Sequence, residues 1–222
     1  MNVRLVSYSQ PAEEFASLQI DDIGDLIAFC ARVSNPSNQY NTETSEKLIK
    51  YLIKNSHWSP LEMVSMCLEI TTTRDIARQI LRHRSFSFQE FSQRYADPIV
   101  DLDFVLREAR LQDHTNRQNS LECDNDLLKE QWNTKQNEVI NLVKKHYRWA
   151  IDHGIAKEQA RAILPEGNTV SKMYMAGTIR SWIHYIQLRS KNGTQKEHQD
   201  IALECAKVIT KLFPAASDVI NT

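Results

Sequence analysis

The chain contains 222 residues, of which 41% are hydrophobic and 25% are charged, and its formal net charge at pH 7 is −1. This length and composition predict a single domain, residues 1–222, with a substantial hydrophobic core, and the small net charge excludes a general attraction to nucleic acid or to an anionic membrane. Because the sequence has no apolar run of about 18 residues and no basic-then-apolar leader, we expect a cytoplasmic protein with no membrane partner.

The first half of the chain changes between helical and extended patterns. Thr44 can cap a helix whose apolar residues recur at helical spacing as far as Ile53, and a loop then begins at His57. Residues 64–70 alternate between apolar and more polar side chains, which predicts a strand. Residues 73–82 then take the period of a short helix, so a helix directly follows that strand.

The second half contains the longest predicted helix, at residues 125–153. Before it, residues 85–92 alternate as a strand does, whereas residues 97–124 are polar and have no regular pattern. After a loop at 165–167 we expect, in order, a strand at 169–175 and helices that begin at about residues 179 and 195. Helices around a small mixed sheet imply an α+β fold.

Cysteine spacing argues against a metal or redox centre. Cys30, Cys67, Cys123 and Cys205 lie far apart and form no Cys-x-x-Cys pair. This spacing does not fit a zinc knuckle or a redox dithiol. We therefore predict reduced thiols and no metal site.

Residues 82–84 have the sequence Arg-His-Arg, here called the RHR triplet, and Ser92 follows after a gap of seven residues. Burying unpaired charge costs several kcal/mol, so three consecutive cationic or titratable side chains are expected to bind an anion rather than fill a core. Glu90, Ser92 and Arg94 recur at a spacing of two, so an extended backbone would place an acceptor, a hydroxyl and a guanidinium on one face. Such a face can read a nucleotide.

An RHR triplet, a gap of seven residues and a serine form the signature of the flavin-dependent thymidylate synthases, and the chain resembles this family. The resemblance extends to HWSPLE at 57–62, to AR at 160–161 with LP at 164–165, and to RS at 180–181 through LR at 188–189. These elements have the order and the approximate spacing that the family shows. Together they identify the family more specifically than the triplet alone.

The resemblance implies a homotetrameric enzyme whose active sites take residues from several subunits. The implied reaction is the reductive methylation of dUMP to dTMP, with methylenetetrahydrofolate as one-carbon donor, FAD as hydride carrier and NADPH as reductant. In this family no enzyme cysteine attacks the pyrimidine, and the four cysteines lie outside the matched elements. The expected partners are therefore dUMP and the folate, and not nucleic acid.

The chain has only five glycines and no Gly-x-Gly-x-x-Gly, so a glycine-rich cradle for the phosphates of a dinucleotide is missing. Arginine can neutralise phosphates instead, because its forked donors match their oxygens. The resemblance implies that FAD contacts His57, Ser59, Arg82, His83, Arg84, Glu90, Thr178, Ile179, Arg180 and His184. Thr178 departs from the asparagine that many members carry, which exchanges an amide for a shorter hydroxyl.

For dUMP the resemblance implies contacts from Gln79, Ile80, Leu81, Arg82, Glu90, Phe91, Ser92, Gln93, Arg94, Arg161 and Arg189. A monophosphate requires convergent cations and hydroxyls, and Gln79 carries the donor and the acceptor needed at a uracil edge. Arg189 is the implied catalytic residue. Methylation at carbon five makes the ring a nucleophile, and a guanidinium beside the ring stabilises the developing anion electrostatically, without acting as a base.

Other polar residues have simpler interpretations. Ser92 lacks the Ser-His-acid pattern of a nucleophile, and a phosphate contact explains it. His146, Trp149 and His153 lie at helical spacing, and they are expected to form a helix face without chemistry, as is the pair Glu197-His198.

Two other hypotheses remain open. A nucleic-acid binding module is suggested by the arginines and the aromatic rings Phe86, Phe88 and Tyr95 within residues 82–95, since such rings can stack on bases. The net charge and the core-like alternation of the two phenylalanines argue against it. A flavin-binding scaffold or regulator would keep the fold and lack the activity.

Overall fold

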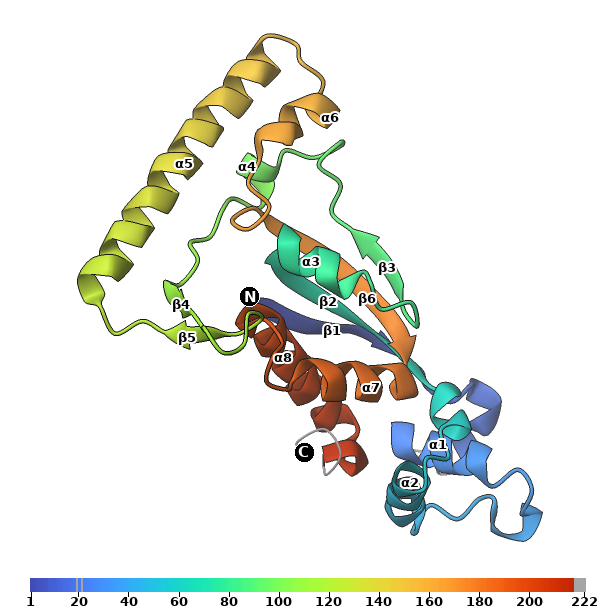
Figure 1. The fold of residues 1–222 in the computed structure, drawn as a ribbon. Helices are drawn as coiled ribbons and strands as arrows, with labels where there is room; N and C mark the ends of the chain where they lie inside the picture. Colours follow the sequence, from blue (N-terminus) through green and yellow to red (C-terminus); the bar gives the residue numbers. More distant parts are fainter. Residues whose placement is uncertain (19, 21, 218–222) are drawn as a thin grey trace.

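The computed structural model describes residues 1–18, 20 and 22–217 and shows an α+β fold, as predicted (Figure 1). Its main sheet has four strands, in the spatial order β1 (Asn2–Tyr8), β2 (Ser65–Thr73), β6 (Val170–Thr178) and β3 (Ser87–Glu90). Neighbouring strands of this sheet are antiparallel throughout the described chain. The prediction of a mixed sheet is therefore wrong. β2 and β3 are joined through a helix, as parallel neighbours are, but β6 lies between them and runs opposite to both.

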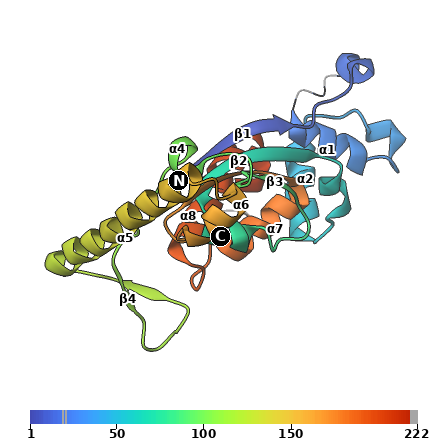
Figure 2. The ribbon, with the colours of Figure 1, turned by 90° about the horizontal axis from the view of Figure 1, so that it is seen from above.

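Three helices pack on one face of the sheet and bury the main core (Figures 1 and 2). They are α3 (Arg74–Ile80), α7 (Ile179–Arg189) and α8 (Lys196–Leu212). Leu68 of β2 and Met175 of β6 face these helices and are fully buried, as the alternating pattern predicts. On the other face, the Tyr174 hydroxyl donates to the Glu69 carboxylate at 3.1 Å. The sheet is thus apolar toward the helices and polar on its other side.

The register of β2 and β6 decides where two of these helices begin. The strands pair along their full length, from Ser65 with Thr178 to Thr73 with Val170. α3 continues directly from the end of β2 and α7 continues directly from the end of β6. The two helices therefore start at opposite ends of the sheet, and their C-terminal ends approach one another over it.

The helices α1 (Ile23–Ala31) and α2 (Ser45–Lys54) lie together at one end of the sheet, beside the 3-10 turn η3 (Ser59–Glu62) (Figure 1). α2 confirms the helix expected after Thr44, and α1 has no counterpart in the prediction. Thr44 does stand at the N-cap position of α2, but its side chain makes no capping bond there. Its hydroxyl instead accepts from Arg32 Nη2 at 2.8 Å.

The segment without a regular pattern forms a short helix and a hairpin, α4 (Pro98–Asp101), β4 (Arg110–Gln112) and β5 (Ser120–Glu122). Asp113 orders the turn of the hairpin, because its carboxylate accepts from the Thr115 hydroxyl at 2.7 Å and from Asn119 Nδ2 at 2.9 Å. These bonds hold the pKa of Asp113 well below its usual range. Local side-chain bonds, rather than apolar periodicity, therefore shape this segment.

The longest helix, α5 (Asp126–Asp152), confirms the prediction for residues 125–153 and projects from the body of the molecule (Figures 1 and 2). It buries Gln136, Ile140, Tyr147 and Ala150 and leaves several large apolar side chains exposed. α6 (Lys157–Ala160) leads back to the sheet; the remaining short turns are η1 (Glu13–Leu18), η2 (Pro36–Asn38), η4 (Arg161–Ile163) and η5 (Pro214–Ala216). Within the described residues no helix is long and apolar enough to cross a membrane.

The strand expected at 85–92 is observed only at Ser87–Glu90. After Glu90 the Phe91 N–H donates to the Lys172 carbonyl at 2.8 Å, and the chain then turns, with the Tyr95 N–H donating to the Ser92 carbonyl at 3.1 Å. The expectation that Glu90, Ser92 and Arg94 share one strand face is therefore wrong.

Candidate active site

The RHR triplet lies in the turn between α3 and β3, and Phe86 holds this turn against α7. Phe86 is 9% exposed, and its ring centroid lies 4.8 Å from that of Trp182. Gly177 permits this approach, because a Cβ there would come within 2.5 Å of the Phe86 ring. Arg82 and Arg84 remain exposed. A buried anchor thus fixes the turn while its two guanidinium groups stay accessible to an anion.

Arg189 meets the triplet from the C-terminal end of α7. Its Nε donates to His83 Nε2 at 2.9 Å, and the His83 ring lies edge-on to Tyr185 with centroids 4.9 Å apart. Burial, together with the charges of Arg189 and Arg82, lowers the pKa of His83 to about 4, so the imidazole is neutral at pH 7. Because Nε2 accepts from Arg189, His83 carries its proton on Nδ1. The positive charge of Arg189 is therefore held in place beside the triplet.

Mild acid is expected to destabilise the fold through His83 and His198. Their pKa values in the folded chain are about 4 and about 3, compared with 6.5 for an ordinary histidine. Between the pKa values of the folded chain and 6.5, the unfolded chain has more protons bound to these two histidines than the folded chain has. The free energy of unfolding therefore rises with pH in this range. Melting temperatures should therefore rise from about pH 5 to 6.5, a range above the titration of ordinary carboxylates.

Two variants separate this effect from other titrations. His198→Gln should make the dependence of the melting temperature on pH shallower, whereas His114→Gln, at an exposed position of the β4–β5 hairpin, should leave it unchanged. A dependence as steep in His198→Gln as in the wild type would contradict the assignment.

Several flavin candidates gather where η3 meets α7. Arg180 Nη1 donates to a Glu62 carboxylate oxygen at 2.5 Å, and the ring centroids of His184 and Trp58 lie 4.5 Å apart. Burial and the charge of Arg180 lower the pKa of His184. His57 lies just before η3 and Ser59 is its first residue, and both side chains are exposed. α7 thus connects this group to the triplet, since the Ser181 hydroxyl at its start donates to the Ser85 carbonyl at 3.3 Å.

Three candidates have side chains that the fold itself uses. Thr178 caps α7, since its hydroxyl accepts from the Ser181 N–H at 3.3 Å. Ile179 is fully buried and its N–H donates to the Val64 carbonyl at 2.9 Å. Ile80 is also fully buried in the core. The side chains of Ile179 and Ile80 are therefore not available to a ligand.

Glu90, a candidate for contact with both FAD and dUMP, bonds to residues outside the groups described above. Its carboxylate accepts from the Ser171 hydroxyl at 2.7 Å and pairs with Arg74 Nη1 at 3.4 Å. Both partners sit on or beside the strands β2 and β6 rather than on α7. The structure thus uses Glu90 to hold β3 to β6 and to the start of α3.

A second group of nucleotide candidates lines a separate cavity of about 310 Å³. Gln93 and Arg161 line it together with Arg74 and Arg78. Gln93 is 4% exposed, and within the described chain its side-chain nitrogen is buried without a hydrogen-bond partner. A buried donor left unpaired is costly unless a ligand or water satisfies it. Three arginines and an unpaired buried donor give this cavity the character of an anion site.

Two carboxylates, Glu158 and Glu166, also line this cavity, and each pairs with an arginine. Arg78 Nη2 lies 2.5 Å from Glu166 Oε1, and Arg94 Nη2 lies 3.4 Å from Glu158 Oε2. Arg74 and Arg78 were not among the sequence candidates. The sequence does show that arginines are frequent between residues 74 and 94. This frequency does not predict which of these arginines share a cavity.

Gln79 faces α8 instead of this cavity. Its Nε2 donates to Gln195 Oε1 at 2.8 Å, and its Oε1 lies 3.2 Å from His198 Nδ1. Glu197 and His198 are 7% and 0% exposed. The pair therefore lies on a buried face of α8, and the expectation that it takes no part in chemistry stays a prediction.

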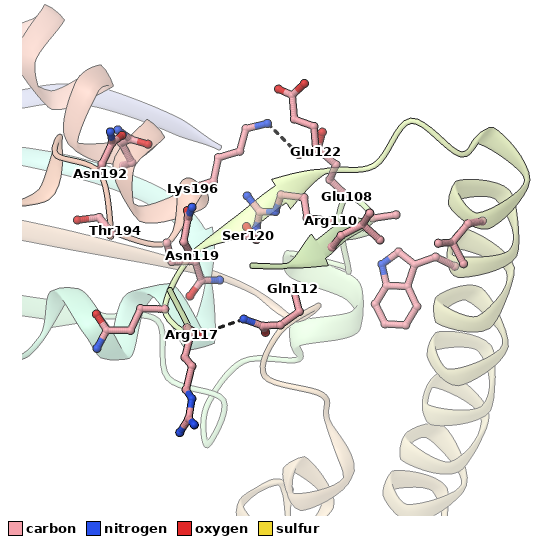
Figure 3. Close-up of a pocket in the computed structure, with 18 residues that line it drawn as sticks. Glu108, Arg110, Gln112, Arg117, Asn119, Ser120, Glu122, Asn192, Thr194 and Lys196 are labelled. Carbon is pink, nitrogen blue, oxygen red and sulfur yellow. Dashed lines mark hydrogen bonds and ion pairs between the residues drawn. The ribbon is translucent and has the colours of Figure 1, made fainter. Parts of the chain in front are cut away.

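A cavity of about 700 Å³ lies between the β4–β5 hairpin, α5 and the start of α8 (Figure 3). Asn119 of the hairpin, Trp132 of α5 and Lys196 of α8 line it, with Gln195. Its lining contains none of the residues implied by the resemblance. The hairpin that sequence patterns left undefined thus builds a wall of this cavity.

Possible metal ligands do not cluster in the described part of the chain. No group of three or more His, Cys, Asp or Glu side chains is arranged to hold an ion among the described residues. The four cysteines are free thiols, as predicted. Burial raises the pKa of Cys205, which fits a packing role.

The chain is similar to known proteins over nearly its whole length. A family model described as thymidylate synthase complementing protein matches residues 18–215. The chain is 48% identical over 221 residues to the flavin-dependent thymidylate synthase of Synechocystis sp., with 100% of both chains covered. It is 46% identical over 221 residues to the probable flavin-dependent thymidylate synthase of Paramecium bursaria Chlorella virus 1, covering 100% of this chain and 99% of the relative.

A solved structure shares the fold. The UMP/dUMP methylase PolB from Streptomyces cacaoi, bound with 5-Br dUMP, matches with a TM-score of 0.82 and 24% identity. The match covers 99% of this chain and 94% of that structure. At this level of identity the likeness supports the architecture described above.

Proposed function

The chain belongs to the flavin-dependent thymidylate synthase family, and we propose that it converts dUMP to dTMP by reductive methylation as a single domain of residues 1–222. In this proposal methylenetetrahydrofolate donates the carbon and NADPH supplies the reducing equivalents. The observation that carries the proposal is Arg189, held by the neutral His83 beside the exposed arginines of the RHR triplet. This arrangement presents a fixed cation where negative charge develops on a pyrimidine.

The residues around the triplet fit FAD. Arg82 and Arg84 are exposed on a turn with a buried anchor, and Arg180 lies half-buried at the start of α7. Their guanidinium groups suit the two phosphates in a chain without a glycine-rich cradle. Once reduced by NADPH, bound FAD would supply the hydride that completes the methyl group. The chain's own residues bind and orient it, and we assign this role to the triplet together with His57, Ser59, Thr178, Arg180 and His184.

We assign dUMP to the two groups of nucleotide candidates. The cavity of Gln93 and Arg161 suits the monophosphate, because it combines arginines with an unpaired buried donor. Gln79 and Arg189 suit the pyrimidine, Gln79 at its polar edge and Arg189 beside the ring. Within one chain the two groups lie on different sides of α3, since Arg78 pairs with Glu166 while Gln79 bonds to Gln195. A complete site then combines groups from different copies of the chain.

We propose a homotetramer for this reason. The exposed apolar surface of α5 supports it, because Trp132, Leu142 and Trp149 are 43%, 56% and 54% exposed on a helix that projects from the body. Exposed apolar patches of this kind mark interaction surfaces. Sedimentation should give a mass about four times that of one chain, and a stable, active monomer would contradict the assembly.

Arg84→Ala is expected to weaken FAD binding about tenfold or more, because a charge-assisted hydrogen bond to phosphate is lost. Flavin titration of the apoprotein measures this. Arg117→Ala, at an exposed position of the β4–β5 hairpin, is the matched control and should bind FAD as the wild type does. Unchanged affinity in Arg84→Ala would move the phosphate contact to another arginine.

The nucleic-acid hypothesis loses part of its stacking surface, since Phe86 is buried against Trp182 and Tyr185. The free thiols support our placement of the enzyme in the cytoplasm.

The deciding assay is dTMP formation from dUMP and methylenetetrahydrofolate with NADPH, under anaerobic conditions, with FAD added or withheld. Product that depends on FAD supports the proposal. Binding of flavin and dUMP without product favours a scaffold, and binding of neither with salt-dependent oligonucleotide binding favours the nucleic-acid module.

A further inference from the structure

A chain of hydrogen bonds runs through the interior from Glu197 to Tyr185 and passes through Gln79. Gln195 Nε2 donates to Glu197 Oε2 at 3.0 Å, and Gln79 Nε2 donates to Gln195 Oε1 at 2.8 Å. His198 Nδ1 lies 3.2 Å from Gln79 Oε1, and His198 Nε2 lies 3.2 Å from the Tyr185 hydroxyl. Gln79 thus joins α3 to α8, and His198 joins α8 to α7.

The carboxylate of Glu197 decides the direction of each bond in this chain. A carboxylate only accepts, so Gln195 must turn its amide nitrogen toward Glu197 and its oxygen toward Gln79. Gln79 must then turn its oxygen toward His198, which requires the His198 proton on Nδ1. Burial, with Arg189 and His83 nearby, lowers the pKa of His198 to about 3. The neutral ring therefore accepts from the Tyr185 hydroxyl through Nε2.

Two arginines from the segment between α4 and α5 hold Glu197 in its ionised form. Arg110 Nη2 and Arg107 Nη1 lie 2.5 Å and 3.3 Å from Glu197 Oε1. Burial acts to raise the pKa of Glu197, but the bond from Arg110 and the charge of Arg107 outweigh it and leave the pKa lowered. Arg110 stands on the hairpin in Figure 3, where it lines the large cavity together with Gln195. The hairpin therefore supplies Arg110, the cation that fixes the Glu197 end of this chain of hydrogen bonds.

We propose that Glu197 and Gln195 are positioning residues that fix the orientation of the Gln79 carboxamide and thereby set which pyrimidine the site accepts. This rests on the proposed function, in which Gln79 contacts the uracil edge. Once oriented, Gln79 keeps one amide hydrogen and one oxygen lone pair for a ligand, and these cannot exchange places. Uracil has a donor at position 3 and an acceptor at position 4, whereas cytosine has the reverse. A carboxamide that cannot flip therefore distinguishes the two bases.

The first test compares dUMP and dCMP binding to the FAD-loaded protein by calorimetry. Gln195→Met keeps the approximate side-chain volume and the Glu197 ion pairs but frees Gln79 to flip. We expect the ratio of the dCMP to the dUMP dissociation constant to fall about tenfold, the value of one neutral hydrogen bond. Glu197→Gln should act in the same direction, because an amide at this position donates as well as accepts.

The matched control is Glu204→Gln, on the same helix. Glu204 pairs with Lys207 at the surface, at 2.6 Å, so this variant makes the same chemical change away from Gln79. It should leave the dissociation-constant ratio unchanged. If Gln195→Met weakened both nucleotides equally, its role would be structural only and the proposal would be overturned.

The second test needs no nucleotide and no stable variant of Glu197. Nitrogen NMR of the holoenzyme with labelled histidine reports the His198 tautomer, assigned by the loss of its signal in His198→Gln. We expect the Nδ1–H form in the wild type and a mixture in Gln195→Met. A wild-type ring protonated on Nε2 would overturn the proposal, whichever nucleotide binds.

Combining the two tests separates this proposal from the proposed function. The expected tautomer without any dUMP binding would overturn the role of Gln79 in the proposed function, and with it the role in specificity. A tautomer that changes in Gln195→Met while the dissociation-constant ratio does not would overturn the specificity role alone.

Discussion

Arg189→Ala is expected to lower the rate constant for dTMP formation by about 100- to 1000-fold, the usual effect of removing one positioned electrostatic donor. The Nε of Arg189 is already engaged with His83, so the guanidinium has a defined place beside the triplet. In the proposed function its charge stabilises the anion that forms only as the pyrimidine becomes a nucleophile. The rate constant should therefore fall much more than the KM for dUMP rises.

Folding and flavin content should survive the Arg189→Ala change. The side chain is only partly buried and lies outside the apolar core cluster, so little packing is lost. Removing the charge should also raise the pKa of His83, because Arg189 is one of the groups that lower it.

The controls for Arg189 test charge and geometry separately. Arg189→Lys keeps the charge but not the forked donor, and it should recover only part of the activity. Lys191→Ala removes an exposed cation two residues further along and should behave as the wild type does. Wild-type turnover in Arg189→Ala would remove the catalytic assignment.

Arg161→Ala should raise the KM for dUMP about 10- to 100-fold, because a charge-assisted hydrogen bond to the monophosphate is lost. Arg161 lines the cavity in which the Gln93 nitrogen is buried without a partner. Flavin content and the rate constant at saturating dUMP should change little, since the side chain lies apart from α7 and the triplet. Steady-state kinetics with the FAD-loaded enzyme measures both quantities.

A substrate without phosphate makes the Arg161 test specific. Binding of deoxyuridine should be the same in Arg161→Ala and in the wild type, because the nucleoside has no group for this arginine to contact. Arg117→Ala again serves as the exposed arginine control. If Arg161→Ala weakened deoxyuridine and dUMP by the same factor, the cavity would not be the phosphate site.

Local patterns in the sequence predicted most of the helices and strands. The apolar periods placed α2, α5 and β6 to within a few residues, and the residue order of the RHR triplet and its companion motifs identified the family. They failed where local hydrogen bonds, rather than apolar periods, set the path of the chain. The hairpin ordered by Asp113 has no apolar period, and β3 ends at Glu90 because the chain turns.

By itself, the sequence determined the family, the α+β class and the extent of most helices and strands, because periodicity and motifs are properties of neighbouring residues along the chain. Only the tertiary structure decided that β6 lies between β2 and β3 and that Arg74 and Arg78 share a cavity with Gln93. It also decided that Glu197 is linked to Gln79 through Gln195. A helical period shows which face of α8 is buried but not what packs against it. The partners of His198 come from α3 and α7, and these contacts exist only once the helices meet over the sheet.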